Sequence, residues 1–265
     1  MRRLAPLLLL LPMPLFAELS PEEAEQTFAV ANTEYQAGES FKELDPATAR
    51  EHYLRAALRY ERLIAEGGLQ NGQMYFDWAN SLLGAGDYGR AILNYHRALL
   101  FLPGDALIEH NLTLARRQRS TNLGVSGATD RPSGLAWTAT AKYQAAAFIA
   151  VWALAWGLTS WRLFRPRTVQ RTTQAAAFGA AGVLLLLTVA SAGQFGQQHG
   201  VLTAKQSTAR QGDGAGYQPA LAELLQAGAE FRILESGADW SRVELAVGES
   251  VWLPQLDFTI VENIR

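Results

Sequence analysis

The 265-residue sequence predicts a multidomain membrane protein that combines an α-helical repeat array, a two-helix transmembrane hairpin and a small all-β barrel. Three observations support this class: a helical pattern of repeat length in the first half, two long uncharged stretches in the middle, and short alternating apolar runs between glycines at the end. The expected segments are a signal peptide (1–17), a repeat domain (18–117), a linker (118–141), a first transmembrane helix (142–162), a cytoplasmic loop (163–173), a second transmembrane helix (174–196) and a β domain (199–265).

The composition excludes several classes of protein. Hydrophobic residues make up 49% and charged residues 18% of the chain, which argues against disorder over most of its length. The chain has no cysteine, so disulfides, cysteine-ligated metals and a catalytic thiol are excluded. A net charge of −2 argues against nucleic-acid binding. Residues 142–173 carry only basic charges and residues 174–198 carry none, which is typical of a membrane protein with soluble parts.

The N-terminus has the pattern of a secretory signal. Arg2 and Arg3 precede an apolar run that ends at Ala17. This run is too short to cross the ~30 Å hydrocarbon core of a bilayer. We expect cleavage after Ala17, with an uncleaved anchor or a buried core helix as the alternatives.

Residues 143–161 and 174–196 contain no charged side chain and have the length of membrane-spanning helices. Two buried helices of a soluble core are the alternative. The loop between them contains no acidic residue and four arginines, which are Arg162, Arg165, Arg167 and Arg171. The positive-inside rule assigns such a loop to the cytoplasm. The expected location is therefore a bacterial inner membrane, with both terminal domains in the periplasm.

The helical pattern is clearest in the 34 residues from Gly72 to Asp105. Small residues at Ala79, Ala91 and Ala98 allow two antiparallel helices to approach closely, and a proline follows the second helix. This pattern resembles the tetratricopeptide repeat.

An irregular repeat precedes this one, and half a repeat follows it. The earlier repeat begins with a helix capped by Ser20, with Glu23 three residues on, and residues 39–47 read as an insertion. The half repeat starts at Ala106 and has the character of a capping helix. About two and a half repeats are close to the minimum for a stable stack.

Repeats of this kind bind peptides or partner domains in a concave groove. The positions expected to face the groove are Gln73, Phe76, Asn80, Leu83 and His110. Repeats that clamp a terminal carboxylate pair asparagine with lysine or arginine. Phe76 beside Asn80 therefore argues against such a clamp.

The last 65 or so residues change to short β-type runs separated by glycine-rich turns. These runs cover residues 201–204, 229–235, 240–246, 250–254 and 258–261. Their order resembles the bacterial SH3-like domain, in which Gly228, Trp240 and Trp252 match the signature positions. Val251 departs from it, because the family usually has glycine before the second tryptophan. The two tryptophans are either core residues or a ligand platform.

No catalytic motif is present in the sequence. None of the four histidines lies in an HExxH pattern or at metal-ligand spacing, and neither GxSxG nor SxxK occurs. We therefore expect no enzyme activity, no catalytic residue, no cofactor and no metal.

The whole domain order resembles the BatE family of the Bacteroides aerotolerance group. The likeness rests on the 34-residue repeat, the following Asn111-Leu112 segment, and the DWSRVEL and VWLP segments of the β domain. The resemblance implies a non-catalytic envelope protein that works with von Willebrand A-type membrane partners and a MoxR-type ATPase. The leading hypothesis is a scaffold or adaptor that binds protein partners through its repeats and its SH3-like domain. The alternative is a cell-wall sensor whose SH3-like domain binds peptidoglycan.

Overall fold

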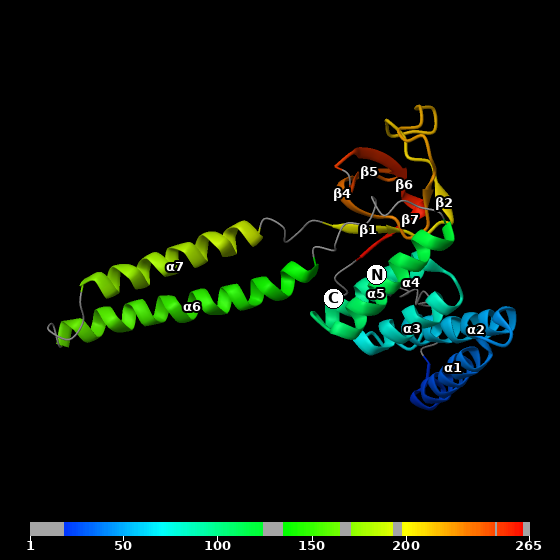
Figure 1. The fold of residues 1–265 in the computed structure, drawn as a ribbon, viewed down its shortest axis with the longest axis horizontal. Helices are drawn as coiled ribbons and strands as arrows, with labels where there is room; N and C mark the ends of the chain where they lie inside the picture. The colour runs from blue at the N-terminus through cyan, green and yellow to red at the C-terminus, as the bar shows by residue number, and fades with distance from the viewer. Residues whose placement is uncertain (1–18, 124–134, 165–170, 193–197, 247, 262–265) are drawn as a thin grey trace, which may run out of the picture.

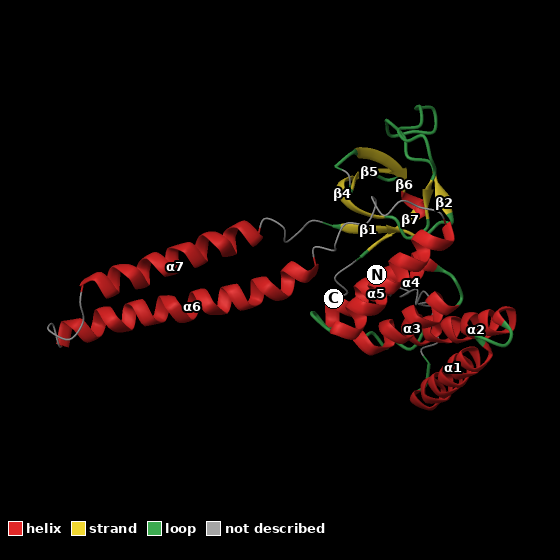
Figure 2. Ribbon diagram, viewed as in Figure 1, coloured by secondary structure: helices red, strands yellow, loops and turns green. Residues whose placement is uncertain are grey.

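The computed structural model describes residues 19–123, 135–164, 171–192, 198–246 and 248–261. A helical array, a pair of long helices and a small β unit follow one another along the chain (Figures 1 and 2). The predicted signal peptide lies outside the described residues.

The array is built from five helices in which each packs on the next. They are α1 (Pro21–Phe41), α2 (Pro46–Ala65), α3 (Gly72–Gly84), α4 (Tyr88–Phe101) and α5 (Ala106–Leu123). Ser20 caps α1 through a complete capping box with Glu23, as predicted. Asp45, Asn71 and Asp87 cap the next three helices by accepting backbone N–H groups.

The predicted insertion at residues 39–47 is mostly helical. Helix α1 continues to Phe41 and α2 already begins at Pro46, so only Lys42–Asp45 connect them. The first pair of helices is thus longer than the second, and the irregularity lies in helix length. Pro46 favours this sharp start because its fixed φ suits the first helical position.

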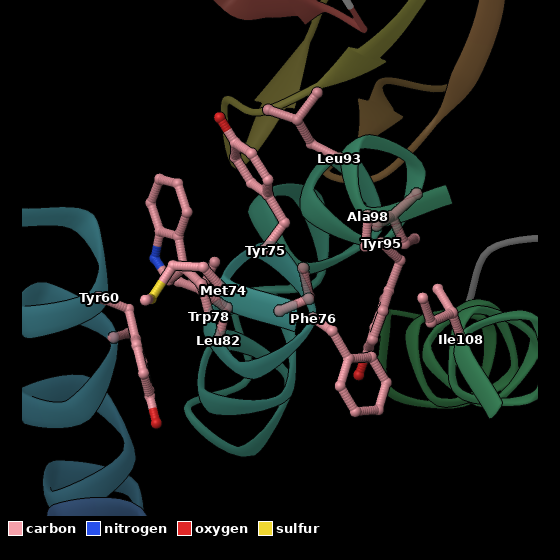
Figure 3. Close-up of a cluster of buried hydrophobic side chains, with 14 of the residues drawn as sticks. Tyr60, Met74, Tyr75, Phe76, Trp78, Leu82, Leu93, Tyr95, Ala98 and Ile108 are labelled. Carbon is pink, nitrogen blue, oxygen red and sulfur yellow. The ribbon is translucent and has the colours of Figure 1, made fainter. Parts of the chain in front are cut away.

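The core of the array lies between successive helices (Figure 3). Tyr60 packs against α3, and Phe76, Tyr95 and Ile108 fill the space where α3, α4 and α5 meet. The three alanines expected at close helix contacts are fully buried; these are Ala79, Ala91 and Ala98. The prediction of a repeat-like helical stack is confirmed at this level, and the array is compatible with tetratricopeptide geometry.

The β unit contains all five runs that the sequence predicts as strands. Its strands are β1 (His199–Leu202), β2 (Gln206–Ser207), β3 (Leu225–Gln226), β4 (Glu230–Ser236), β5 (Trp240–Leu245), β6 (Ser250–Pro254) and β7 (Phe258–Ile260). Five of them form an antiparallel sheet in the order β6-β5-β4-β1-β7, and β2 pairs with β3. This arrangement is compatible with an SH3-like fold.

Two long helices lie side by side and extend outward from the helical array and the sheet (Figure 1). They are α6 (Leu135–Phe164) and α7 (Arg171–Ala192). Phe178 of α7 packs edge-on against Trp152 and Trp156 of α6, with ring centroids 5.9 and 6.0 Å apart. The predicted linker 118–141 is helical at both ends, and its middle lies outside the described residues.

The prediction of a transmembrane hairpin at 142–162 and 174–196 is wrong. Within the described residues, no helix combines the length and the apolar character needed to cross a bilayer. The absence of charge indicated a membrane span, but an uncharged helix is not necessarily apolar enough to cross a bilayer. Gly157, Thr159 and Ser160 interrupt the apolar part of α6. The fold class is therefore a helical array with a small antiparallel sheet.

The sheet packs directly on the helical array (Figure 1). Val201 of β1 belongs to the core of the array, and α4 approaches β1 so closely that a Cβ at Gly89 would lie 2.7 Å from the Leu202 carbonyl. Glu230 of β4 is buried at this junction and bonds His96 of α4 and Arg116 of α5. The helical array and the sheet are thus joined by apolar and charged contacts.

Candidate functional site

A groove of about 830 Å³ runs along the face formed by α1, α2, α3 and α5. Aromatic, aliphatic and polar side chains line it, including Tyr35, Tyr53, Leu54, Asn80, Leu83, Asn111 and Leu114. Because these residues come from four helices, the packing of the repeats creates the groove. It is the best candidate for a binding site in the part of the chain described here.

The structure brings together only two of the five predicted groove residues. Asn80 and Leu83 line the groove, whereas Phe76 is 8% exposed and packs against Tyr95 in the core. Gln73 is exposed and donates a hydrogen bond to its neighbour Asp77. His110 lines a separate cavity of about 300 Å³ on α5. Whether any of the five contacts a partner stays a prediction.

The sequence reasoning missed the groove residues supplied by α1, α2 and α5. One of them could have been found, because Leu114 lies 34 residues after Asn80, which is one repeat length. The 34-residue spacing could not identify Tyr35 and Tyr53, because the first repeat has longer helices than the second. In the sequence, Asn111 is distinguished only by the family-like Asn111-Leu112 segment.

Asparagines at the floor of the groove form a hydrogen-bond network. The Asn80 Oδ1 atom accepts bonds from the Tyr95 hydroxyl at 2.7 Å and from the Asn111 amide at 2.9 Å. Both lone pairs of this oxygen are therefore used, which leaves the Asn80 amide group as a donor and the Asn111 carbonyl as an acceptor. The floor presents the complementary pair of groups that a peptide backbone requires.

Tyrosines form one wall of the groove. The Tyr53 hydroxyl donates to Glu39 at 2.5 Å, and its ring packs edge-on against Tyr35 at 5.6 Å. Burial, together with the negative charges of Glu39 and Asp77, raises the pKa of Tyr35 to about 12. Burial also raises the pKa of Tyr53. Both phenols therefore stay neutral at physiological pH. Tyr53 is buried, with Gly38 and Gly84 against its ring, whereas Tyr35 is half-buried.

The groove continues into a second cavity of about 550 Å³ between the array and the sheet. Four residues line both cavities: Arg50, Leu54, Gly86 and Tyr88. The sheet side of the second cavity is formed by Thr203, Lys205, Gln206, Gln226 and Ala227. One continuous surface therefore spans both parts of the chain.

Glu230 fixes the relative position of these two parts. Its carboxylate accepts bonds of 2.7 Å from His96 Nε2, Arg116 Nε and Arg116 Nη2. Burial alone would raise the pKa of Glu230, but attraction to His96 and the bonds from both partners outweigh it and hold the pKa at about 2. The carboxylate is thus ionised at neutral pH.

The three signature positions of the β unit have different surroundings. Gly228 has a φ of +80°, and a Cβ there would lie 2.8 Å from Arg119 Cδ, so this glycine serves the junction with the array. Buried and half-buried residues alternate along β5 and β6. Val243 and Leu253 point into the core, whereas Trp240 and Trp252 are half-buried on the outward face of the sheet. They are therefore not core residues of the sheet.

The groove and junction offer hydrogen-bonding, aromatic and charged groups suited to binding. Within the described ranges, no three His, Asp or Glu side chains converge as the ligands of a metal would.

Comparison of the chain with protein family models, curated proteins and solved structures finds no match. The functional conclusion therefore depends on the geometry of the molecule itself.

Proposed function

We propose that this chain is a non-catalytic adaptor that binds a segment of a protein partner along the groove. The observation that carries the proposal is the groove of about 830 Å³, whose floor presents an amide donor and an amide acceptor between apolar side chains. Concave, mostly preformed sites with a few oriented polar groups are typical of ligand recognition. An extended peptide backbone can bond Asn80 and Asn111 while its side chains contact Leu83 and Leu114.

The buried junction between the helical array and the sheet supports a role as an adaptor. Because Glu230 joins β4 to α4 and α5, the groove and the outer surface of the sheet face a partner in one fixed orientation. Two weak contacts held in a fixed geometry give a combined affinity well above either alone. The resemblance to the BatE family makes von Willebrand A-type proteins the first partners to test.

Site-specific photocrosslinking tests whether a partner occupies the groove. A photoreactive amino acid replaces Leu83 inside the groove or, as a control, Leu107, which is 58% exposed and lies outside it. The tagged chain is irradiated in cells that express it naturally, and crosslinked peptides are identified by mass spectrometry. We expect a defined protein segment attached at position 83 and absent at position 107.

A matched pair of variants on α5 then measures binding to the recovered segment. Leu114→Asp introduces a charge in the groove, whereas Leu107→Asp introduces the same charge outside it. We expect Leu114→Asp to weaken binding at least about tenfold, because a buried contact of this kind is worth ~1.4 kcal/mol or more. Equal affinity for both variants would contradict the proposal.

A cell-wall ligand for the β unit is a second candidate function. Trp240 and Trp252 occupy neighbouring strands on the outward face, where Trp240 lies opposite Pro254 and Trp252 opposite Arg242. Half-buried aromatic faces can stack on sugar rings. In co-sedimentation of the full chain with purified peptidoglycan, the variant with both tryptophans replaced by alanine should stay in the supernatant. Failure of the unmodified chain to sediment would contradict this candidate.

A further inference from the structure

The cavity between the helical array and the sheet carries unpaired positive charge. We infer that it binds a carboxylate of the partner segment, either a chain terminus or an acidic side chain, through Arg50 and Lys205. This inference rests on the proposed peptide-binding function. It adds that the peptide places a carboxylate in the cavity where the groove meets the sheet. The carboxylate site is built from both parts of the chain, so neither part forms it alone.

The position of the Arg50 side chain is fixed by the turn between α3 and α4. Its Nε atom donates to the Ala85 carbonyl at 2.6 Å, and its Nη2 atom lies over Gly86, where a Cβ would be 3.3 Å away. A guanidinium held by Nε keeps its terminal nitrogens as donors for a carboxylate. Since its side chain is already anchored, little conformational entropy is lost when it binds.

Neither cation is neutralised by the protein in the described part of the chain. No carboxylate there lies within salt-bridge distance of Arg50 or Lys205, whereas Arg62 and Arg90 are both paired. Asp87, the acidic residue of this cavity, is engaged by the side chain and the backbone N–H of Arg90. The cavity therefore has an excess of positive charge, which favours an anionic group.

The remaining lining suits a peptide better than a small inorganic anion. Leu54, Ala85 and Ala227 provide apolar contacts for the carbon atoms next to a carboxylate. Gln206 and Gln226 lie opposite each other on β2 and β3, where their amides can bond a peptide backbone. The continuity of this cavity with the groove lets one segment occupy both.

Selection from random peptides tests the inference directly. Two libraries, one with free C-termini and one with internal random segments, are selected against the full chain and against the double variant Arg50→Gln/Lys205→Gln. The matched control, Arg62→Gln/Arg242→Gln, removes one arginine from α2 and one from the sheet, outside both cavities. Circular dichroism and thermal unfolding confirm that all three proteins are folded.

From the free-terminus library we expect the unmodified chain and the control to select peptides whatever their side chains, and from the internal library to enrich acidic peptides. The double variant should lose this selection. Enrichment from the free-terminus library identifies a terminal carboxylate, and enrichment from the internal library an acidic side chain. The affinity of one selected peptide should fall about tenfold or more in the double variant. Selection from the internal library without acidic enrichment, or selection from either library that is unchanged in the double variant, would overturn the inference and leave the proposed function standing. Failure to select any peptide would overturn both.

Discussion

Replacing Glu230 by glutamine tests whether the buried charge cluster holds the sheet on the helical array. Glutamine keeps the shape of the side chain and one acceptor oxygen but removes the charge that His96 and Arg116 face. Glu230 is 5% exposed, so water does not replace the lost interaction. Removing one member of a buried ionic cluster leaves its partners buried without compensation.

The magnitude follows from the pKa of Glu230, which is about 2 in the folded chain against an ordinary 4.5. Each unit of this difference corresponds to ~1.36 kcal/mol, so ionised Glu230 contributes about 3 kcal/mol to folding at neutral pH. Because the folded pKa is lowered, this contribution is present above pH 4.5 and is lost as the pH falls toward 2. Roughly half of it remains near pH ~3.

Urea denaturation followed by tryptophan fluorescence measures the difference. At neutral pH we expect Glu230→Gln to lower the free energy of unfolding by about 3 kcal/mol, and this deficit should shrink by about half near pH ~3. Amide hydrogen exchange should also accelerate in α4 and β4, which meet at the junction. A full-sized deficit at acidic pH would refute the electrostatic reasoning, and no deficit at neutral pH would refute the role of the cluster.

Glu235→Gln on the same strand is the matched control. The Glu235 side chain is 60% exposed and lies 3.3 Å from Arg242. Exposed pairs of this kind contribute little, so we expect a change below about 0.5 kcal/mol. A loss comparable to that of Glu230→Gln would show that charge removal on β4, and not burial at the junction, causes the effect.

Three further predictions concern local stability. Gly228→Ala should destabilise the chain by more than about 1 kcal/mol in a thermal melt, because the residue has a φ of +80° and a new Cβ would lie 2.8 Å from Arg119 Cδ. Gly248→Ala is the control and should destabilise the chain less, because Gly248 has a φ of +85° but open space around it. Tyr95→Phe should cost about 1 kcal/mol in urea denaturation, because it removes the bond to Asn80, and an unchanged midpoint would contradict the network. Ser20→Ala should lower the free energy of unfolding by about 1 kcal/mol and accelerate hydrogen exchange in the first turn of α1. Exchange that the substitution accelerates equally along all of α1 would argue against the cap.

Local patterns in the sequence determined most of the secondary structure. The Ser20 cap, the three alanines of the central repeat and the alternating runs of the β unit act over a few residues, so their effects can be seen in one segment at a time. The same reasoning correctly predicted helices at the uncharged stretches of α6 and α7 but wrongly predicted that they span a membrane. Absence of charge is a local property, but it does not measure whether a helix is apolar enough to cross a bilayer.

Tertiary structure alone decided the binding surface and the junction. Glu230 lies 134 residues from His96, and no periodicity in the chain relates them. The groove likewise combines Tyr35 with Asn111, whose helices meet only through the packing of the array. Arg50 and Lys205 share a cavity because the sheet packs on α4. Contacts between distant segments depend on how whole helices and sheets pack together, and the residue pattern of a single segment does not predict that packing.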